Sequence, residues 1–498
     1  MSRDDVWDLV VLGGGTAGIV AAKTASGLGA RVLLIEQNKT GGDCLWTGCV
    51  PSKSILAVAH GVARSTTTVG MGVSISSEAI DFPKVMQYVK RVINEIAPQD
   101  SVEALTDAGV TVIQGSAAFS CPSSITVDAV EHYFARAIIA TGAAPAVPAI
   151  PGLGEVNYLT SENIWELEKL PEKLLILGAG SIGCELGQAF ARLGSEVTLI
   201  DSAERILPRE DESSSRILTN QLTSEGVKIL TSVKVKSIES AFNGEGFIFF
   251  DLPDDTSRKI SFDRILIAVG RSPRSRGIGL EKAGVELTTQ GFVAISDSLR
   301  STNRNIWAAG DITGHPQFTH LAGVHGSTAA SNAVLGLSRK AEVKVVPRVT
   351  FTDPEVAAVG IASNTNNSNL RVLERHNGDV DRAITESKVG GITKIVIDSK
   401  GKIVGGLIVG PRAGEALAEV TLAIRMGLTT RDLASTIHPY PTYGDGLWSI
   451  AIADVRNQLM APRVKFIFQI LRSLTRLRNH KSYNQQMTGG SSGDHQSH

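Results

Sequence analysis

Two glycine-rich turns constrain this sequence more strongly than any other feature. The first turn, Gly13 to Gly18, reads Gly-Gly-Gly-Thr-Ala-Gly and lies between an apolar strand, Asp8 to Leu12, and a helix-forming run. In such a strand–turn–helix context, backbone N–H groups and the helix dipole hold a pyrophosphate. The glycines that this geometry requires are Gly13, Gly15 and Gly18. The next strand ends at Glu36, which is placed to accept hydrogen bonds from a ribose.

The same pattern returns 165 residues later. A strand from Leu174 to Leu177 precedes the second turn, and the strand after it ends at Asp201. The glycines required in the second turn are Gly178, Gly180 and Gly183. Two dinucleotide folds in one chain imply two different dinucleotides, and we expect FAD and a nicotinamide. The Asp201 carboxylate favours NADH because it repels a 2′-phosphate, while Arg205 and Arg209 downstream keep NADPH open as the alternative.

A cysteine pair lies between the two turns. Cys44 and Cys49 are five residues apart, and two glycines before them let the backbone pass close to a planar ligand. Lys53 follows one helical turn after Cys49, and both a nearby cation and a helix N-terminus lower a thiol's pKa. The alternatives are a structural disulfide or two buried thiols, and zinc would need further ligands nearby. We interpret the pair as a redox-active dithiol and expect no resident metal.

Length and composition indicate a multidomain enzyme. A chain of 498 residues is too long for one hydrophobic core, so about three domains are expected. The net charge of −1 argues against a bulk affinity for nucleic acid. Four cysteines and the lack of an apolar signal region at the N-terminus favour a cytoplasmic protein over a secreted, disulfide-rich one.

Further strand ends suggest that one nucleotide-binding domain is inserted into the other. The strand Ala137 to Ala140 ends in Thr141-Gly142, a similar strand ends at Gly270, and a third ends at Asp311. Prolines 145, 148 and 151 mark a linker between the units. From Pro347 the pattern changes to β-rich segments, so a third domain is expected to start there.

These motifs, in this order, resemble those of the FAD-dependent pyridine nucleotide–disulfide oxidoreductases over roughly Val6 to Pro462. The resemblance implies an α/β protein with two Rossmann-like dinucleotide-binding domains and an α+β C-terminal domain that forms a homodimer. The expected boundaries are residues 1–151 and 276–346 for the two parts of the FAD-binding domain, 152–275 for the inserted NAD(P)-binding domain, 347–462 for the dimerisation domain, and 463–498 for a basic amphipathic helix and disordered tail.

The resemblance also implies roles for individual residues. Cys49 would lie next to the flavin, and Cys44 would exchange with the substrate. Lys53 and Glu185 match the family's ion pair beside the flavin ring, and Asp311 matches the acid that binds the FAD ribitol. The other cofactor-binding candidates are Gly41, Gly42, Thr141, Gly142 and Gly270. Electrons would therefore pass from NADH or NADPH through FAD to the dithiol and on to a small acceptor.

The chain departs from the family pattern near its C-terminus. Disulfide reductases of this family carry His-x-His-Pro-Thr-x-x-Glu there, and the partner subunit contributes the second His as the acid–base group. This chain has Tyr440 at the position of that His and Asp445 at the position of the Glu, with His438 two residues earlier. A tyrosine with an ordinary pKa of about 10 is a poor base at neutral pH. Only His438, from a shifted position, offers a replacement.

The resemblance extends to mercuric-reductase-like members, through Trp46-Thr47 and the run from Val380 to Ala383. No cysteine follows Cys184, however, so the C-terminal pair that delivers Hg(II) in that enzyme is lacking. We expect a mercuric-reductase-like oxidoreductase with a small acceptor other than Hg(II). The alternatives are dihydrolipoamide dehydrogenase or another disulfide reductase such as glutathione reductase, and, in a different class, a non-catalytic redox sensor or scaffold.

The C-terminal segment forms a separate feature. Residues 463–478 interleave apolar and basic side chains at three- and four-residue spacing, which predicts a basic amphipathic helix. Such a helix packs on the dimer or attaches to an anionic membrane, and disorder is expected after Tyr483. Structural roles are expected for Cys121, Cys184, His320 and His325.

Overall fold

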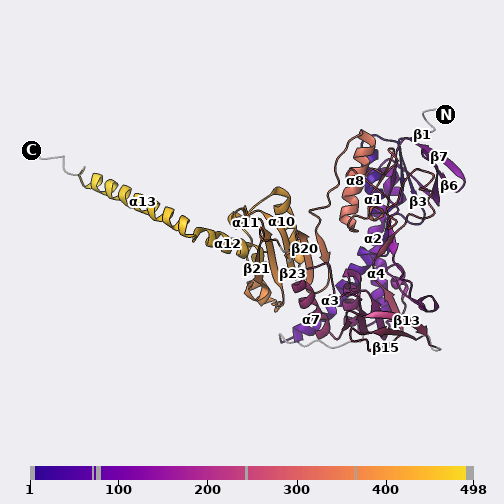
Figure 1. Cartoon of the computed structure of the whole chain (residues 1–498), viewed down its shortest axis with the longest axis horizontal. Coiled ribbons are helices and arrows are strands. Elements are labelled where there is room, and N and C mark those ends of the chain that lie inside the picture. Colours follow the sequence, from indigo (N-terminus) through magenta and orange to yellow (C-terminus); the bar gives the residue numbers. More distant parts are fainter. Residues whose placement is uncertain are drawn as a thin grey trace, which may run out of the picture.

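Figure 1 shows the computed structural model of the chain. The structure describes residues 6–69, 72–73, 80–241, 245–363, 365 and 367–488, with backbone only for residues 66–69, 463 and 480–488. It contains two parallel sheets that each follow a glycine turn, and a separate antiparallel sheet nearer the C-terminus. The first parallel sheet lies at one end of the body with α1 and α8, and the antiparallel sheet lies between the body and a long terminal helix, α13.

The first parallel sheet has five strands in the order β18-β8-β2-β3-β4. Their bounds are Ile306–Ala308, Ala137–Ile139, Leu9–Leu12, Val32–Glu36 and Val110–Gln114. Both of its faces are buried, which explains why the central strands read as continuous apolar runs. One face packs on helices α1 (Thr16–Gly27) and α8 (Thr319–Leu335), which approach closely because a Cβ at Gly326 would lie 2.3 Å from the Ala17 carbonyl oxygen.

The opposite face of this sheet packs against a smaller four-stranded sheet. Its order is β1-β7-β6-β5, with bounds Val6–Trp7, Val130–Phe134, Ser124–Val127 and Ala117–Cys121. Successive residues of β2 therefore alternate between two cores, with Val11 facing the helices and Val10 facing this sheet. Strand β18 joins the first sheet after the chain has passed through the second unit, so the two units are interleaved in sequence.

The second parallel sheet has the order β12-β11-β10-β16. Its strands span Lys228–Leu230, Glu196–Ile200, Lys173–Leu177 and Arg264–Ile267, and helices α6 (Ser181–Arg192) and α7 (Glu212–Ser224) accompany it. An antiparallel sheet of β13 (Lys234–Ser240), β14 (Gly246–Asp251) and β15 (Ser257–Phe262) shares a core with it. The chain enters through β9 (Ala143–Pro145) and leaves through β17 (Arg271–Pro273), and these two strands pair antiparallel. Both crossings between the units therefore lie side by side.

Four helices connect the units around the cysteine stretch. They are α2 (Gly42–Trp46), α3 (Cys49–Val69), α4 (Phe82–Ile96) and α5 (Val102–Asp107). Helices α3, α4 and α6 contribute to one hydrophobic core that also includes Val356 and Leu407 of the C-terminal sheet. The α/β class predicted from the sequence is confirmed, whereas the residue numbers of the predicted domain boundaries stay predictions.

The C-terminal sheet is antiparallel, in the order β19-β20-β23-β22-β21. Its strands span Arg348–Thr350, Glu355–Gly360, Ile403–Gly410, Ile392–Ile397 and Arg371–His376. The helices of this region are α9 (Asp381–Thr385), α10 (Ala413–Met426), α11 (Thr430–Ser435) and α12 (Asp445–Leu459). Helix α13 (Pro462–Thr488) follows and runs away from the sheet (Figure 1). The backbone thus stays helical past Tyr483, where the sequence suggested disorder, and residues 489–498 lie outside the described residues.

Candidate active site

The two glycine turns have the same geometry. Gly13 and Gly178 adopt φ of +106° and +110°, which favour glycine, and a Cβ at either would lie 2.4 Å from a carbonyl oxygen of the neighbouring strand end. A Cβ at Gly18 or Gly183 would lie 1.8 or 1.9 Å from the carbonyl oxygen of the first glycine of its own turn. Each helix can therefore pack closely on its turn only if these positions carry no side chain.

The acids that end the second strands are held in equivalent ways. Glu36 Oε2 accepts a hydrogen bond of 2.6 Å from Gly14 N, and Asp201 Oδ2 accepts one of 2.6 Å from Ala179 N. The second oxygen of Asp201 accepts from Ala203 N at 2.8 Å. These bonds fix both carboxylates beside their turns, and both side chains line a cavity.

That cavity has a volume of about 2980 Å³ and joins both turns. The sequence-predicted residues that line it are Gly13, Gly15, Glu36, Gly42, Cys44, Cys49, Lys53, Thr141, Gly142, Gly178, Gly180, Glu185, Asp201, Gly270 and Asp311. Gly18, Gly183 and Gly41 support the turns from behind without forming part of the lining given by the described residues. The structure thus gathers residues from widely separated parts of the chain into one cavity.

The turns fit dinucleotides in their donor chemistry as well as in shape. Helices α1 and α6 begin after Gly15 and Gly180, neither has a side-chain cap, and neither has an acid in its first turn. Their first N–H groups are therefore available to an anionic ligand. A Cβ at Gly180 would meet no atom within 4 Å, so a side chain there would occupy ligand space.

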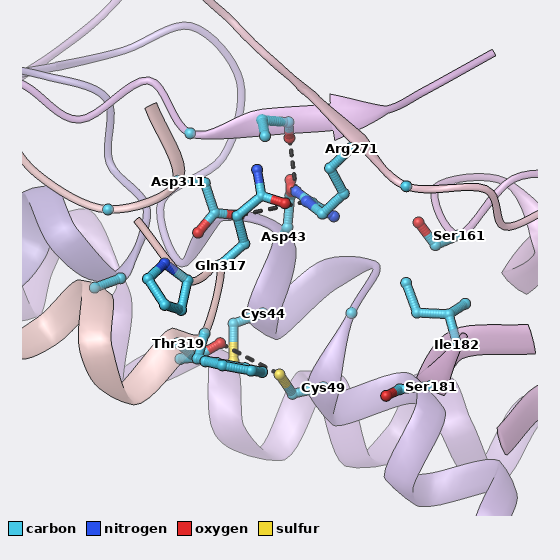
Figure 2. A pocket seen from close by; sticks show the side chains of 18 of the residues that line it. Asp43, Cys44, Cys49, Ser161, Ser181, Ile182, Arg271, Asp311, Gln317 and Thr319 are labelled. Carbon is cyan, nitrogen blue, oxygen red and sulfur yellow. Dashed lines mark hydrogen bonds and ion pairs between the residues drawn. The ribbon is translucent and has the colours of Figure 1, made fainter. Parts of the chain in front are cut away.

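The cysteine stretch is docked onto the first turn. Gly41 N donates to Gly14 O at 2.9 Å, and a Cβ at Gly42 would lie 2.6 Å from the Gly15 Cα. Helix α2 ends at Trp46 and helix α3 begins at Cys49, so the two cysteines belong to different helices rather than to one distorted helix. Both are free thiols. Figure 2 shows their sulfur atoms near Thr319, whose Oγ1 lies 3.3 Å from Cys49 Sγ.

The environment of Cys49 stabilises its thiolate. The hydrogen bond from the Cys44 thiol is the largest influence, and together with Thr319 and the Lys53 ammonium it outweighs burial and lowers the pKa of Cys49 to about 6. The same bond and burial raise the pKa of Cys44 well above its ordinary value. Cys49 also begins helix α3, where the helix dipole favours an anion. One thiolate and one thiol therefore face each other at neutral pH.

Lys53 and Glu185 form an ion pair across the units. Lys53 Nζ lies 2.8 Å from Glu185 Oε2, and it also lies 4.4 Å from the centroid of the Phe351 ring. Glu185 is 5% exposed, and its Oε1 accepts a hydrogen bond of 2.9 Å from Phe351 N. This carboxylate therefore connects α3, α6 and the segment after β19 next to the dithiol.

An arginine that the sequence analysis did not single out organises the other side of the dithiol. Arg271 donates to Asp43 and, at 2.7 Å, to Ala143 O, while its Nε lies 3.3 Å from Asp311 Oδ2 (Figure 2). Burial raises the pKa of Asp311, and the Arg271 charge opposes that rise. Gln317 lies beside this cluster, and its buried Nε2 has no partner among the described residues. Asp43 directly precedes Cys44, so its pairing could have been suspected from the sequence.

The C-terminal candidates lie apart from the dithiol within one chain, since none of them lines the cavity formed by the described residues. His438 donates or accepts at Thr436 O (2.9 Å) and at Glu419 Oε1 (2.8 Å), and its side chain is 7% exposed. Tyr440 is 69% exposed and donates to Asp381 at 2.6 Å, which raises the pKa of the phenol. Asp445 accepts from Thr442 N at 3.0 Å. The acid beside His438 is therefore Glu419, which the sequence analysis missed.

The remaining cysteines and histidines have local partners. Cys184 is fully buried, and its thiol donates to Ala179 O at 3.4 Å. His320 and His325 contact the carbonyl oxygens of Pro347 and Glu342. Across the described ranges, no group of three or more His, Cys, Asp or Glu side chains is arranged to hold a metal ion.

Comparison with known proteins identifies the class to which this fold and site belong. Residues 7–326 match the pyridine nucleotide-disulphide oxidoreductase family, and residues 346–450 match the dimerisation domain of that family. The chain belongs to the pyridine nucleotide-disulphide oxidoreductases. The predicted family and the prediction of an oxidoreductase are confirmed, and the dimerisation domain supports a homodimer.

Individual relatives carry more than one name. The chain is 36% identical to a mercuric reductase of Bacillus cereus over 447 residues, which cover 89% of this chain and 70% of that protein. It is 35% identical to a dihydrolipoyl dehydrogenase of Thermus scotoductus over 453 residues, which cover 90% and 97%. Among solved structures, the HOCl-induced flavoprotein disulfide reductase RclA from Escherichia coli, in its Cu(II) complex, matches with a TM-score of 0.80 and 27% identity, covering 90% of this chain and 99% of that one.

Proposed function

We propose that this chain is an FAD-dependent NADH oxidoreductase that passes electrons through the Cys44–Cys49 dithiol to a small acceptor. The observation that carries the proposal is that the Cys49 thiolate site and both glycine turns line one cavity. Bound FAD supplies the two-electron relay between the nicotinamide and the dithiol. The chain's own residues bind the two cofactors, fix their relative position and hold the thiolate.

The first turn, with Glu36 and Asp311, fits FAD, because the cysteine stretch packs directly onto it. The second turn, with Asp201, fits the nicotinamide dinucleotide. NADH is favoured over NADPH because Arg205 is occupied by the hydroxyl of Ser215 and three backbone carbonyl oxygens of residues 207–210. Arg209 is exposed at the cavity, and of the two arginines it is the one available to a 2′-phosphate.

The dithiol can exchange two electrons with an acceptor without a remote base. The Cys44 thiol donates its hydrogen bond to Cys49, so the Cys49 thiolate is the local proton acceptor when Cys44 reacts. With a disulfide acceptor, Cys44 forms a mixed disulfide and expels one thiol. Cys49 then attacks the Cys44 sulfur, the second thiol leaves, and the Cys44–Cys49 disulfide remains.

The C-terminal residues bear on the identity of the acceptor. Tyr440, which replaces the family's acid–base histidine, has a raised pKa, and His438 is held inward by Glu419. This arrangement disfavours acceptors whose leaving thiol must be protonated, and it favours a soft metal ion that binds both sulfurs. The Cu(II) complex of RclA supports this choice. A small disulfide is the second candidate, since the dihydrolipoyl dehydrogenase relatives align over nearly their whole length.

Anaerobic reduction with NADH tests the proposal. We expect a long-wavelength absorbance band from the Cys49 thiolate beside the flavin in the native protein and in Cys44→Ser, and no band in Cys49→Ser. If the native protein and both variants give the same spectrum, the dithiol plays no part and the proposal fails.

Reoxidation of the reduced protein then identifies the acceptor. Cu(II), Hg(II), lipoamide and glutathione disulfide are added in parallel, with Cys44→Ser as the control for each. We expect reoxidation by Cu(II) to be at least about tenfold faster than by either disulfide, since a disulfide lacks its acid–base partner here. Faster reoxidation by a disulfide would favour the second candidate.

A further inference from the structure

Helix α13 presents an apolar face that nothing in the chain covers. Its large apolar side chains are between 46% and 64% exposed, and they are Phe466, Ile467, Phe468, Ile470, Leu471, Leu474 and Leu477. Single exposed apolar residues are ordinary, but a contiguous group of this size marks an interaction surface. Figure 1 shows the helix extending beyond α12, away from the sheets.

The helix is also strictly basic. Between Pro462 and Asp494 the sequence contains no Asp or Glu, and its cations are Arg463, Lys465, Arg472, Arg476, Arg478 and Lys481. At 100° per residue, Lys465, Arg472 and Arg476 fall within one narrow stripe. Ile467, Leu471 and Leu474 lie on the opposite side of the helix. The helix therefore has a basic face and an apolar face.

These features select among possible occupants. Two copies of α13 could bury their apolar faces together, but each copy would bring several cations and no acid, so the charges would repel. No helix among the described residues is long and apolar enough to cross a membrane. An amphipathic helix with low overall hydrophobicity and a Lys/Arg-rich polar face binds in the plane of an anionic bilayer.

We propose that α13 attaches the protein to anionic lipid bilayers, with the apolar face inserted at the headgroup boundary and the basic face near the lipid phosphates. The attachment is independent of the dithiol chemistry. Both matches to the family end by residue 450, before α13 begins, so this surface is an addition to the shared fold.

Vesicle flotation of the full-length flavoprotein tests the proposal. We expect binding to phosphatidylcholine vesicles that contain phosphatidylglycerol to exceed binding to pure phosphatidylcholine vesicles by at least about tenfold at low salt, and to weaken at high salt. The variant Arg472→Glu/Arg476→Glu should lose at least about tenfold in binding to the anionic vesicles. Leu471→Asp/Leu474→Asp should lose a similar factor while it keeps every cation.

Lys90→Glu/Lys169→Glu is the matched control, because it makes the same charge change at exposed positions far from α13 in sequence. It should float like the native protein, and all variants should retain bound flavin and the same NADH-dependent reduction. Equal flotation of native protein with both vesicle types overturns the proposal, and so does unchanged flotation of the α13 variants. If the α13 variants instead convert a dimer to monomers in light scattering without any change in flotation, the apolar face belongs to the subunit interface.

Discussion

The two nucleotide-binding units share one turn and differ in everything that follows it. In both, the first glycine has a positive φ, the third closes on the carbonyl of the first, and a carboxylate bonds the turn's second residue. After the first acid comes the cysteine stretch, which docks onto the turn through Gly41. After the second acid comes a loop that Arg205 fastens to itself. The turn therefore defines a pyrophosphate site, and the flanking residues define what each site does.

The units meet at one ion pair, and their contributions to it are unequal. The first unit supplies Cys49 and Lys53, whereas the second supplies Glu185 from the middle of α6. Lys53 lowers the pKa of Cys49 and Glu185 raises it. The second unit thus tempers the reactivity of a group that belongs to the first, which a comparison of the turns alone would miss.

The sharpest way to break the equivalence of the turns is to block each in turn. In Gly18→Ala and Gly183→Ala the new Cβ meets a backbone carbonyl oxygen at 1.8 and 1.9 Å, so the helix must move off its turn. Overpacking of this kind weakens ligand binding by roughly 10- to 100-fold. We expect Gly18→Ala to lose FAD, measured by flavin absorbance of the purified protein. Gly183→Ala should keep FAD and lose reduction by NADH.

Gly27→Ala is the control, because a Cβ there meets no atom within 4 Å although the residue lies in the same helix as Gly18. It should behave as the native protein does. Loss of flavin in Gly183→Ala with full flavin in Gly18→Ala would reverse the assignment of the two sites.

The shared ion pair can be tested through the sign of its effect on Cys49. Lys53→Met removes a charge that lowers the Cys49 pKa, so the pKa should rise, whereas Glu185→Gln should lower it further. Below pH 7 the thiolate fraction then falls in the first variant and grows in the second. We expect alkylation of reduced protein by iodoacetamide near pH 6 to slow by about three- to tenfold in Lys53→Met, since one pKa unit changes the thiolate ratio tenfold.

Iodoacetamide rates measured from pH 5 to 9 give the pKa directly, and Cys44→Ser reports how much of the shift depends on the neighbouring thiol. If both variants move the pKa in the same direction, the change reflects altered packing at the pair rather than its charges.

Much of this fold could be predicted because its signals are local. A strand, a glycine turn and a terminal acid lie within about 25 residues of each other in both units, and each signal follows from backbone sterics. The pairing of Lys53 with Glu185 is not local, and only the family resemblance indicated it. The structure adds the reason for its position, since Glu185 also holds the backbone of Phe351.

The clusters that sequence analysis missed share a different property. Arg271 joins Asp43 and Asp311 from three separate elements, and Glu419 pairs with His438 across the C-terminal domain. No periodicity or spacing in one sequence encodes such pairs, because each depends on how distant segments pack. The same holds for Tyr440, whose partner Asp381 was noted only as part of a similar-looking run.

The smallest expected effect concerns the second unit alone and separates its two arginines. Arg209→Ala should lower kcat/KM with NADPH by about fivefold and leave the value with NADH within about twofold, because an exposed cation contributes roughly 1 kcal/mol to phosphate binding. Arg205→Ala removes hydrogen bonds to Ser215 and three carbonyl oxygens, so it should lower the free energy of unfolding by about 1–3 kcal/mol. Its NADPH/NADH ratio should not change. Denaturant unfolding and steady-state kinetics of both variants measure these effects, and a fall in NADPH activity confined to Arg205→Ala would mean that its local hydrogen bonds give way to the cofactor.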